Sequence, residues 1–490
     1  MRRALGCLLL LACLSLHAQE RVSPAAMRQA TATGTARVMV MLRDPATSLP
    51  LATAGAVRAR RQAVAADTGR VLRMLAPSRF RVARRFVLVP AIVLEVDQAG
   101  LRRLAAMPGV SKVDLDAGGG IDSVAPDESS VLNRVDLLPE MGLTGAGEEI
   151  AVIDTGIDTD HADFAGRIVD QACFCSATGG SGGCCPNAQA TQFGAGAAED
   201  AHGHGTNVAG IMAGAGHVAP RGVAPLARIV AVRVLDASGR FCCSSDIVAA
   251  MDWIATNHAE VSAVNLSLGS DQAFSGNCDA STAWTQALAM ALDNLVQLGA
   301  VVSVSSGNDG NLNGMQAPAC VKAALSVAAT WDAYGGSTLF LGCTDASTAP
   351  MQPTCFSNRG SATDVFAAGA FVTSTGKNGA TSTYGGTSQA APMAGACAAL
   401  LHEAAPAATV QQRMDAIVLS PARINDAASG RQYPFLDCED AARLLDPAAL
   451  QPIVKHDSPP IVPRLPATLR SGDPQPPQAR TIPRAARADR

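Results

Sequence analysis

Short apolar runs alternate with segments of helical periodicity in the second half of the chain. Runs of about four to eight mostly apolar residues predict buried strands. Four of them stand at residues 150–153, 228–235, 263–268 and 300–304. Between these runs, a helix that Ser245 caps is predicted from apolar residues at helical spacing, namely Ile247, Val248, Met251 and Ile254.

A second helix is predicted around residues 284–298, where Gly299 ends it before the next apolar run. Strands that alternate with helices favour a parallel sheet with helices on both faces. We therefore expect an α/β domain at residues 131–450. In such a domain, the functional loops lie at the carboxyl ends of the strands.

The first 120 residues carry a different pattern. Residues 37–42 predict a strand, the Arg- and Ala-rich stretch to Leu75 has helical composition, and residues 86–96 predict one or two strands. Asp97 can cap a short helix through Met107, and a last strand follows at residues 110–115. The order β-α-β-β-α-β indicates a small α+β domain of the ferredoxin-like kind, with its core at 37–116. Gly, Asp, Pro and Ser residues at 121–130 indicate a linker.

The two ends of the chain are compositionally distinct. Arg2 and Arg3 precede a short apolar run, and Ala18 precedes a cleavage point, so residues 1–18 predict an export signal. The run is shorter than the roughly 20 residues that span a membrane, and no later stretch qualifies. Two alternatives are a buried helix of a cytosolic protein and a lipoprotein signal ending at Cys13. The Pro- and Arg-rich residues 451–490 predict a disordered tail.

Composition excludes several classes of protein. Hydrophobic residues make up 48% and charged residues 16% of the 490 residues, so the chain can bury a large core. The net charge of -4 does not indicate the excess of Lys and Arg over the whole chain that is typical of nucleic-acid-binding proteins. We therefore expect no nucleic-acid partner and no membrane span.

The cysteines favour an oxidising compartment, outside the cell or in the periplasm. Two of the 14 cysteines lie in the export signal, and the remaining 12 begin at Cys173 and end at Cys438. An even number in an exported chain indicates disulfides, whose pairing the sequence does not determine. Because a bridge between neighbours strains the backbone, we expect the pairs 184–185 and 242–243 to bond outward. Cys397, in an Ala-rich helical stretch, is interpreted as a buried thiol.

Zinc is the competing explanation for part of this cysteine set. Cys173, Cys175, Cys184 and Cys185 have C-x-C and C-C spacings. These spacings differ from the usual zinc-ligand pairs, which are separated by two to four residues. Disulfides are the preferred interpretation, and no metal site is predicted.

Four motifs carry candidate chemistry. Asp154 ends an apolar strand in AVIDTGID, His204 stands in HGHGTNVAG, Asn308 in SSGNDG, and Ser388 in GGTSQAAP. Each has an ordinary structural explanation: a turn former, a polar loop residue, a turn, and a helix N-cap. Their joint occurrence in the order Asp, His, Ser within one α/β unit favours catalysis, because this is a known chain order of the serine-protease triad.

In these motifs the chain resembles the subtilisin-like serine proteases, family S8. The resemblance covers nearly all of residues 131–447, and NLSLG, CFSNRG and GVAP add to it. It implies a triad of Asp154, His204 and Ser388, with Asn308 and the Ser388 N–H as the oxyanion hole. His202 is the alternative base, but the motif context favours His204.

The resemblance also implies the substrate contacts. Residues that match the flanks of the family's S1 pocket are Ser267, Leu268, Gly269, Ser306 and Gly307. Residues near Gln316 are expected to close that pocket. The alternative for the first three is the end of a core strand.

Further implications concern the leader, the metal and the assembly. Residues 19–120 resemble the family's inhibitory propeptide, which is also a folding chaperone and is removed near residues 116–131. No cofactor is expected, and the protein is expected to be monomeric. The loop after the His204 helix, residues 214–221, lacks Asn and Asp, so the calcium site that some relatives place there is not expected. Structural calcium elsewhere is left open.

The leading hypothesis is a secreted or periplasmic serine endopeptidase that is made as an autoprocessed zymogen. A hypothesis from another class is a catalytically silent subtilase fold that acts as a binding or adhesion module. A third is a processing protease with one cognate substrate.

Overall fold

The computed structural model describes residues 21–43, 51, 53–120, 129–136, 138–177 and 182–445. The predicted export signal and the predicted tail lie outside these residues, as does most of the predicted linker. Among the helices of the described residues, none is both long and apolar enough to cross a membrane.

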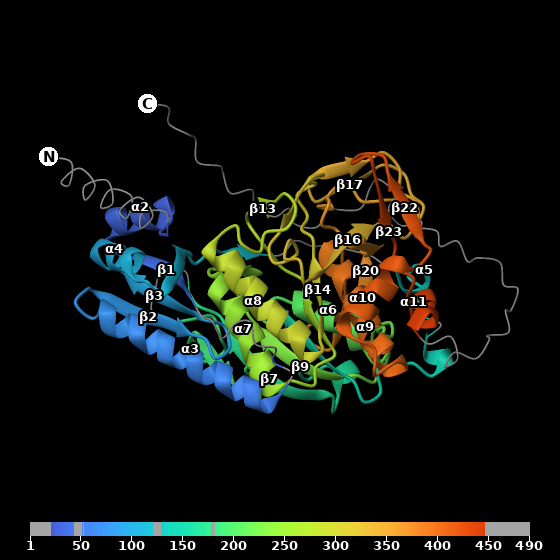
Figure 1. Cartoon of the computed structure of the whole chain (residues 1–490). Coiled ribbons are helices and arrows are strands. Elements are labelled where there is room, and N and C mark those ends of the chain that lie inside the picture. Colours follow the sequence, from blue (N-terminus) through green and yellow to red (C-terminus); the bar gives the residue numbers. More distant parts are fainter. Residues whose placement is uncertain are drawn as a thin grey trace, which may run out of the picture.

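An eight-stranded sheet forms the centre of the larger unit (Figure 1). Its strands are parallel except for the pair β7–β8. Their order across the sheet is β19 (Val365–Ala368), β16 (Leu325–Thr330), β14 (Val301–Ser305), β11 (Ala263–Leu266), β6 (Glu149–Asp154), β9 (Arg228–Arg233), β7 (Ile168–Phe174) and β8 (Thr191–Phe193).

Helices cover both faces of this sheet, as predicted. Along β6, Ile150 and Val152 pack on one face, where helices α6 (His204–Ala213) and α9 (Thr387–Ala404) lie. Ala151 and Ile153 pack on the other face, where α7 (Ser244–Asn257) and α8 (Ala283–Leu298) lie. A strand buried on both faces is continuously apolar, which is why β6 shows no alternation in the sequence. The α/β fold class is confirmed.

The remaining elements of the larger unit surround this core. Two further helices follow α9: α10 (Val410–Leu419) and α11 (Cys438–Leu445). Short helical segments are α5 (Ser129–Leu132), η2 (Leu138–Met141) and η3 (Ala162–Phe164). Small antiparallel pairs are β13 (Ala273–Phe274) with β15 (Met315–Gln316), β17 (Thr338–Phe340) with β18 (Cys343–Asp345), β20 (Val372–Gly376) with β21 (Ala380–Tyr384), and β22 (Arg423–Asp426) with β23 (Arg431–Pro434).

The smaller unit, which we call the leader unit, comprises residues 21–116. Its elements are α2 (Pro24–Thr33), β1 (Ala36–Leu42), α3 (Ala54–Leu75), β2 (Phe80–Arg85), β3 (Ala91–Val96), α4 (Gln98–Ala106) and β4 (Val110–Leu115). The strands form an antiparallel sheet in the order β2-β3-β1-β4. Asp97 caps α4 through a hydrogen bond from the Gly100 N–H, at 2.7 Å.

The predicted strand at 86–96 needs a correction. Residues 86–90 lie between two strands, and the strand before them, β2, is Arg-rich and was missed. Its polarity has a structural reason, because Arg84 forms a buried ion pair with Asp246 of α7, in the other unit.

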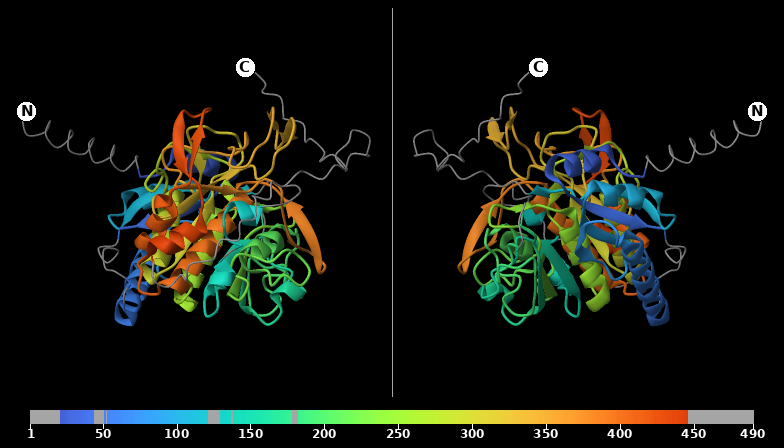
Figure 2. Two further views of the ribbon diagram at one scale, coloured as in Figure 1. Left: turned by 90° about the vertical axis from the view of Figure 1, so that its right-hand side faces the viewer. Right: turned by 90° about the vertical axis from the view of Figure 1, so that its left-hand side faces the viewer.

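The leader unit packs on the α7 and α8 side of the larger unit (Figure 1). Figure 2 shows it, in blue, on the side away from the orange and red helices α9 to α11. The Asp252 carboxylate of α7 accepts the Val87 and Leu88 backbone N–H groups, the latter at 2.8 Å. Burial raises the pKa of Asp252 to about 6.

The predicted cap of α7 is wrong. The helix begins at Ser244, and its N-cap position is Cys243, whose side chain makes no capping bond. The Asp116 carboxylate, at the end of the leader unit, accepts the Ser245 N–H at 2.8 Å instead. A carboxylate at a helix N-terminus also interacts favourably with the helix dipole. The capping group therefore comes from a residue 129 positions earlier in the chain.

All 12 cysteines of the described residues form disulfides, and two predictions about them are wrong. Cys184 and Cys185 bond outward as expected, but Cys242 and Cys243 bond to each other, and Cys397 is bridged rather than free. The spacing of two neighbouring cysteines in the sequence does not reveal whether the backbone there has the conformation that lets them bond to each other. The six pairs are 173–185, 175–184, 242–243, 278–320, 343–355 and 397–438.

Candidate active site

Asp154 and His204 meet at the carboxyl end of β6. The strand ends at Asp154, and His204 is the first residue of α6. The Nδ1 atom of His204 lies 2.7 Å from Oδ1 of Asp154, and both side chains are fully buried. Because a carboxylate only accepts hydrogen bonds, Nδ1 carries the proton. The Nε2 atom of a neutral imidazole is then the free acceptor.

Backbone groups hold this pair in place. Oδ1 of Asp154 also accepts the N–H of Thr155 at 2.7 Å. The Oγ1 of Thr155 accepts the Gly205 N–H at 2.8 Å, beside His204. Asp200 fixes the loop before α6, where its Oδ1 accepts the His202 and Gly203 N–H groups. His204 therefore lies at a helix terminus, and hydrogen bonds fix the loop that precedes it.

Ser388 is the second residue of α9, so its backbone N–H belongs to the helix N-terminus. Its Oγ donates to the Ser267 carbonyl oxygen at 3.3 Å, and no hydrogen bond joins it to His204. The Nε2 of His204 is buried and has no partner among the residues that the structure describes. Catalytic hydrogen bonds are often formed only in the substrate complex.

The helices that carry His204 and Ser388 are joined close to these residues. Gln389 donates from Nε2 to the Asn207 Oδ1 at 3.3 Å, and Asn207 donates from Nδ2 to the Ser382 carbonyl at 3.0 Å. The Asn207 side chain therefore links α6 to α9 and to β21.

Asn308 lies beside the same helix terminus. Its Oδ1 accepts both the N–H and the Oγ1 hydrogen of Thr387, each at 2.9 Å. With the oxygen held in this way, the Nδ2 group points away from Thr387, and it donates to no other described residue. Sequence reasoning missed Thr387, although it lies inside the GGTSQAAP motif directly before Ser388.

His202 is placed differently from His204. Its ring lies 6.4 Å from that of His204, between ring centroids, and no hydrogen bond joins it to Asp154. Burial, and then the neighbouring His204, lower the pKa of His202. The aspartate therefore pairs with the histidine that the motif context favours.

Tyr384 is a neighbour that the sequence did not reveal. Its ring lies edge-on to that of His204, 5.7 Å between centroids. Burial, and then the charges of Asp200 and Asp154, raise the pKa of Tyr384. The sequence offered one indication that Tyr384 lies near the site, because it stands four residues before Ser388.

The predicted substrate contacts border a three-stranded sheet. In it, β5 (Gly119–Gly120) lies between β10 (Arg240–Phe241) and β12 (Gly269–Ser270) and is antiparallel to both. Gly120 is opposite Gly269, so a strand continued in this register would reach Ser267 two residues later. The Leu268 side chain is 1% exposed and packs in the core, so only its backbone lies at this edge.

Ser306 and Gly307 lie across from β12. Ser306 Oγ donates to the Asn358 carbonyl at 2.7 Å, and Gly307 donates its N–H to Thr387 Oγ1 at 3.1 Å. Gln316 lies between the two segments: a Cβ added to Gly269 would be 2.1 Å from its Oε1, and one on Gly307 would be 2.7 Å away. Gln316 Nε2 donates to Asp309 Oδ2 at 2.7 Å.

Two groups of side chains among the described residues have the spacing of metal ligands. They are Cys242, Cys243 and Asp246, and Glu149, His258 and Glu260. The two cysteines of the first group are bonded to each other and offer no thiolate. In the second group, His258 already bridges two carboxylates, with Nδ1 3.0 Å from Glu149 and Nε2 3.2 Å from Asp170.

The loop in which a calcium site was not expected is organised by a carboxylate. The fully buried Asp163 accepts the backbone N–H groups of His217, Val218 and Ala219. A cation in that position would face N–H donors instead of oxygen ligands. Burial raises the pKa of Asp163, but the hydrogen bonds from Ala219, His217 and Val218 outweigh it and lower the pKa below its usual value.

Replacing Asp163 with alanine is expected to lower the free energy of unfolding by about 1–3 kcal/mol, because the buried Ala219 N–H and the partly buried N–H groups of His217 and Val218 lose their acceptor. Since the folded pKa is depressed, the carboxylate's contribution is present above the unfolded pKa near 4 and is lost as the pH falls through the lower folded value. Urea unfolding of the variant and the wild type at pH 7 and pH 3 measures both effects. An equal difference at the two pH values would contradict this assignment.

Comparisons with known proteins identify the family of this chain. Residues 145–435 match the subtilase family. The extracellular serine proteinase of Thermus sp. (strain Rt41A) is 32% identical over 356 residues, which cover 70% of this chain and 74% of that protein. Subtilisin E of Bacillus subtilis (strain 168) is 29% identical over 340 residues, covering 68% and 76%.

Among solved structures, a cold adapted subtilisin-like serine proteinase matches with a TM-score of 0.45 and 26% identity, over 60% of this chain and 90% of that one. The family match spans more than half of the chain and includes all four motifs. The chain therefore belongs to the subtilase family and is a serine-type endopeptidase.

Proposed function

We propose that this protein is a secreted endopeptidase in which Ser388 attacks the peptide bond, His204 is the general base and Asp154 orients it. The observation that carries the proposal is the buried Asp154–His204 hydrogen bond of 2.7 Å, which leaves Nε2 as an acceptor with no partner in the described part of the chain. A serine hydroxyl is a weak nucleophile until a base takes its proton. In the substrate complex, the Ser388 hydroxyl is proposed to leave the Ser267 carbonyl and to donate to His204 Nε2.

The steps follow from the residues present. Ser388 Oγ forms a bond to the substrate carbonyl carbon while His204 takes its proton, and His204 then returns the proton to the leaving amine. Water hydrolyses the resulting acyl-enzyme by the same steps in reverse. The Ser388 N–H and Asn308 Nδ2 donate to the oxyanion. Apart from the substrate and one water molecule, each step uses side chains and backbone groups of the protein, so no cofactor is required.

The leader unit is proposed to be an inhibitory propeptide. Its last residues continue into β5, which fills the place between β10 and β12 where an extended substrate would add a strand. In this register, the residue opposite Ser267 would be the one whose carbonyl meets Ser388. Self-cleavage would then fall within residues 121–130, most of which lie outside the described residues.

Secretion is proposed from two observations. The relative from Thermus is named an extracellular proteinase, and six disulfides link the cysteines of the described residues. Disulfides persist in oxidising compartments. N-terminal sequencing of the exported protein tests both this and the removal of the leader unit, and a mature chain that begins near residue 19 would contradict self-removal.

A serine-directed fluorophosphonate tests the catalytic proposal. We expect stoichiometric labelling of Ser388 in the wild type and none in Ser388→Ala. A correctly folded wild-type protein that is not labelled would instead support a silent binding module. Cleavage of casein at many sites would separate a general endopeptidase from a processing enzyme with one substrate.

Gln316 is proposed to restrict the substrate residue on the acyl side of the cleaved bond to small side chains, because it fills the space between Gly269 and Gly307. Gln316→Gly should raise kcat/KM for a peptide with Phe at this position, relative to one with Ala, by about tenfold or more. The control is Gln432→Gly, on the exposed part of β23, which should leave the ratio unchanged. An unchanged ratio in Gln316→Gly would refute the role.

A further inference from the structure

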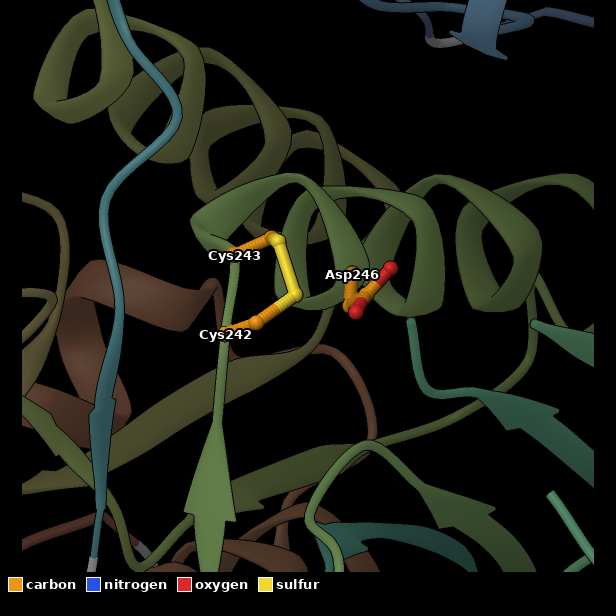
Figure 3. A group of neighbouring side chains, drawn as sticks. All are labelled: Cys242, Cys243 and Asp246. Atoms are coloured by element: carbon orange, nitrogen blue, oxygen red, sulfur yellow. A yellow bond between two sulfur atoms is a disulfide. The ribbon is translucent and has the colours of Figure 1, made fainter. Parts of the chain in front are cut away.

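The bridge between Cys242 and Cys243 lies at a junction that the leader unit and a substrate would share. Strand β10 ends at Phe241, and helix α7 begins at Ser244, so the two cysteines form the whole connection between them. Figure 3 shows the sulfur–sulfur bond at this transition, with Asp246 on the first turn of the helix. Any change in the backbone of Cys242 or Cys243 therefore moves β10 relative to α7.

The end of the leader unit is bound on both sides of this bridge. Before it, β10 pairs with β5, with Phe241 opposite Gly119. After it, the Ser244 N–H donates to the Ala117 carbonyl, and the Ser245 N–H donates to the Asp116 carboxylate. The chain from residue 116 to 120 thus runs along the bridge from end to end.

Directly beside the bridge, the contact is between backbones. A Cβ added to Gly118 would lie 2.7 Å from the Cys242 carbonyl oxygen and 2.9 Å from that of Phe241. Only glycine fits at such an approach. The position of the Cys242 carbonyl, which the bridge helps to hold, therefore determines whether the leader chain can lie there.

A second set of contacts depends on the first turn of α7. Asp246 is buried and accepts hydrogen bonds from Arg84 of the leader unit and, at 2.8 Å, from the Ser176 N–H. Arg37 of the leader unit pairs with Asp116 at 2.8 Å and donates to Ser245 Oγ at 3.1 Å. If this turn frays, the charged contacts of the leader unit are weakened together with its backbone contacts.

The bridge contributes little to global stability, because it joins residues that are one position apart. The stabilisation by a disulfide grows roughly with the logarithm of the loop that it closes, so the pairs 278–320 and 397–438, with separations of 42 and 41, contribute more. Cys242 is also partly exposed, whereas Cys278, Cys320, Cys397 and Cys438 are 0% exposed. We therefore expect that the bridge can be reduced while the domain stays folded.

We propose that the Cys242–Cys243 bridge is a redox-sensitive latch for the leader unit: the disulfide holds the β10–α7 junction in the form that binds residues 116–120, and reduction loosens it. This inference rests on the proposed inhibitory role of the leader unit and names a regulation of that site. It predicts that the leader unit is released faster under reducing conditions.

The chemistry is a thiol–disulfide exchange with a dithiol reductant. A reductant thiolate attacks Cys242 Sγ, the sulfur–sulfur bond breaks, and Cys243 leaves as a thiolate. The second reductant thiol then displaces Cys242 from the mixed disulfide. In total, two electrons and two protons pass to the protein, and the reductant becomes a disulfide.

The test uses the full chain with Ser388→Ala, so that the leader unit stays attached and no proteolysis enters the measurement. The protein is equilibrated with graded dithiothreitol, free thiols are alkylated, and mass spectrometry identifies the reduced pair. Hydrogen exchange is measured at the N–H groups of Ser244, Ser245 and Leu88, with Val264 in the central sheet as reference. We expect the 242–243 pair to be reduced before the buried pairs 278–320 and 397–438, and these three groups to exchange at least tenfold faster once it is reduced, with Val264 unchanged.

The double variant Cys242→Ser/Cys243→Ser should show the same faster exchange without reductant. The matched control is Cys343→Ser/Cys355→Ser, which removes the bridge between β18 and the later Cys355 and should leave this exchange unchanged. If the double variant does not fold, the titration of the Ser388→Ala chain still decides. Reduction of the 242–243 pair only after the other five, or its reduction without faster exchange, would overturn the proposal. Neither result depends on catalysis, which the phosphonate labelling tests separately.

Discussion

Ser388→Ala is expected to lower kcat for peptide hydrolysis by about 10⁶-fold, the loss that removal of the triad serine causes in a subtilisin. The reason is chemical: without Oγ there is no atom to form the acyl-enzyme. His204→Ala should cost a similar factor, because the serine proton then has no acceptor. The double variant should lose little more than either single variant, since the two groups act as one unit.

Controls for this experiment come from exposed residues of the same types. Ser361→Ala and His217→Ala change side chains at the surface and should keep kcat within about twofold. Measurements need the mature form, so the Ser388→Ala precursor is processed in trans by wild-type enzyme. Retention of more than about 1% of wild-type kcat in purified Ser388→Ala, free of the helper enzyme, would exclude Ser388 as the nucleophile.

The central sheet could be predicted from the sequence because its strands are buried on both faces. Such strands are continuous apolar runs, and β6, β9, β11 and β14 stand out for this reason. Strand β2 was missed because it faces another unit with charged side chains, and the charged Arg84 can be buried there because Asp246 is its partner. The pattern of polar and apolar residues in one strand does not reveal which side chain of a distant segment will pair with it in the folded chain.

The same limit applies to the candidate site. Asp154, His204, Asn308 and Ser388 stand in short motifs, so they could be named from the sequence. Thr387 and Tyr384 act through contacts with Asn308 and His204, which only the folded chain reveals. The bridge between Cys242 and Cys243 was not expected, because a bond between neighbouring cysteines strains the backbone. In the structure, these two residues connect the end of strand β10 to the start of helix α7.

Asn308→Ala is expected to lower kcat by about 10²–10³-fold, with KM nearly unchanged, because its amide donates to charge that develops only in the transition state. The orientation of that amide depends on Thr387, whose N–H and hydroxyl both donate to Oδ1. Thr387→Val removes the hydroxyl but keeps the backbone bond, so a loss of about tenfold in kcat is expected. Steady-state kinetics of the mature variants measure both effects.

The two residues should be coupled in a double-mutant cycle. Once Asn308 is alanine, Thr387 has no amide to orient, so Thr387→Val should cost almost nothing further. Asn313→Ala, an exposed asparagine of the same loop, is the matched control and should leave kcat unchanged. If the Thr387→Val loss persisted in the Asn308→Ala background, Thr387 would act on the site by another route. If Asn308→Ala raised KM instead, the amide would bind the ground state, and the Ser388 N–H would be left as the principal oxyanion donor.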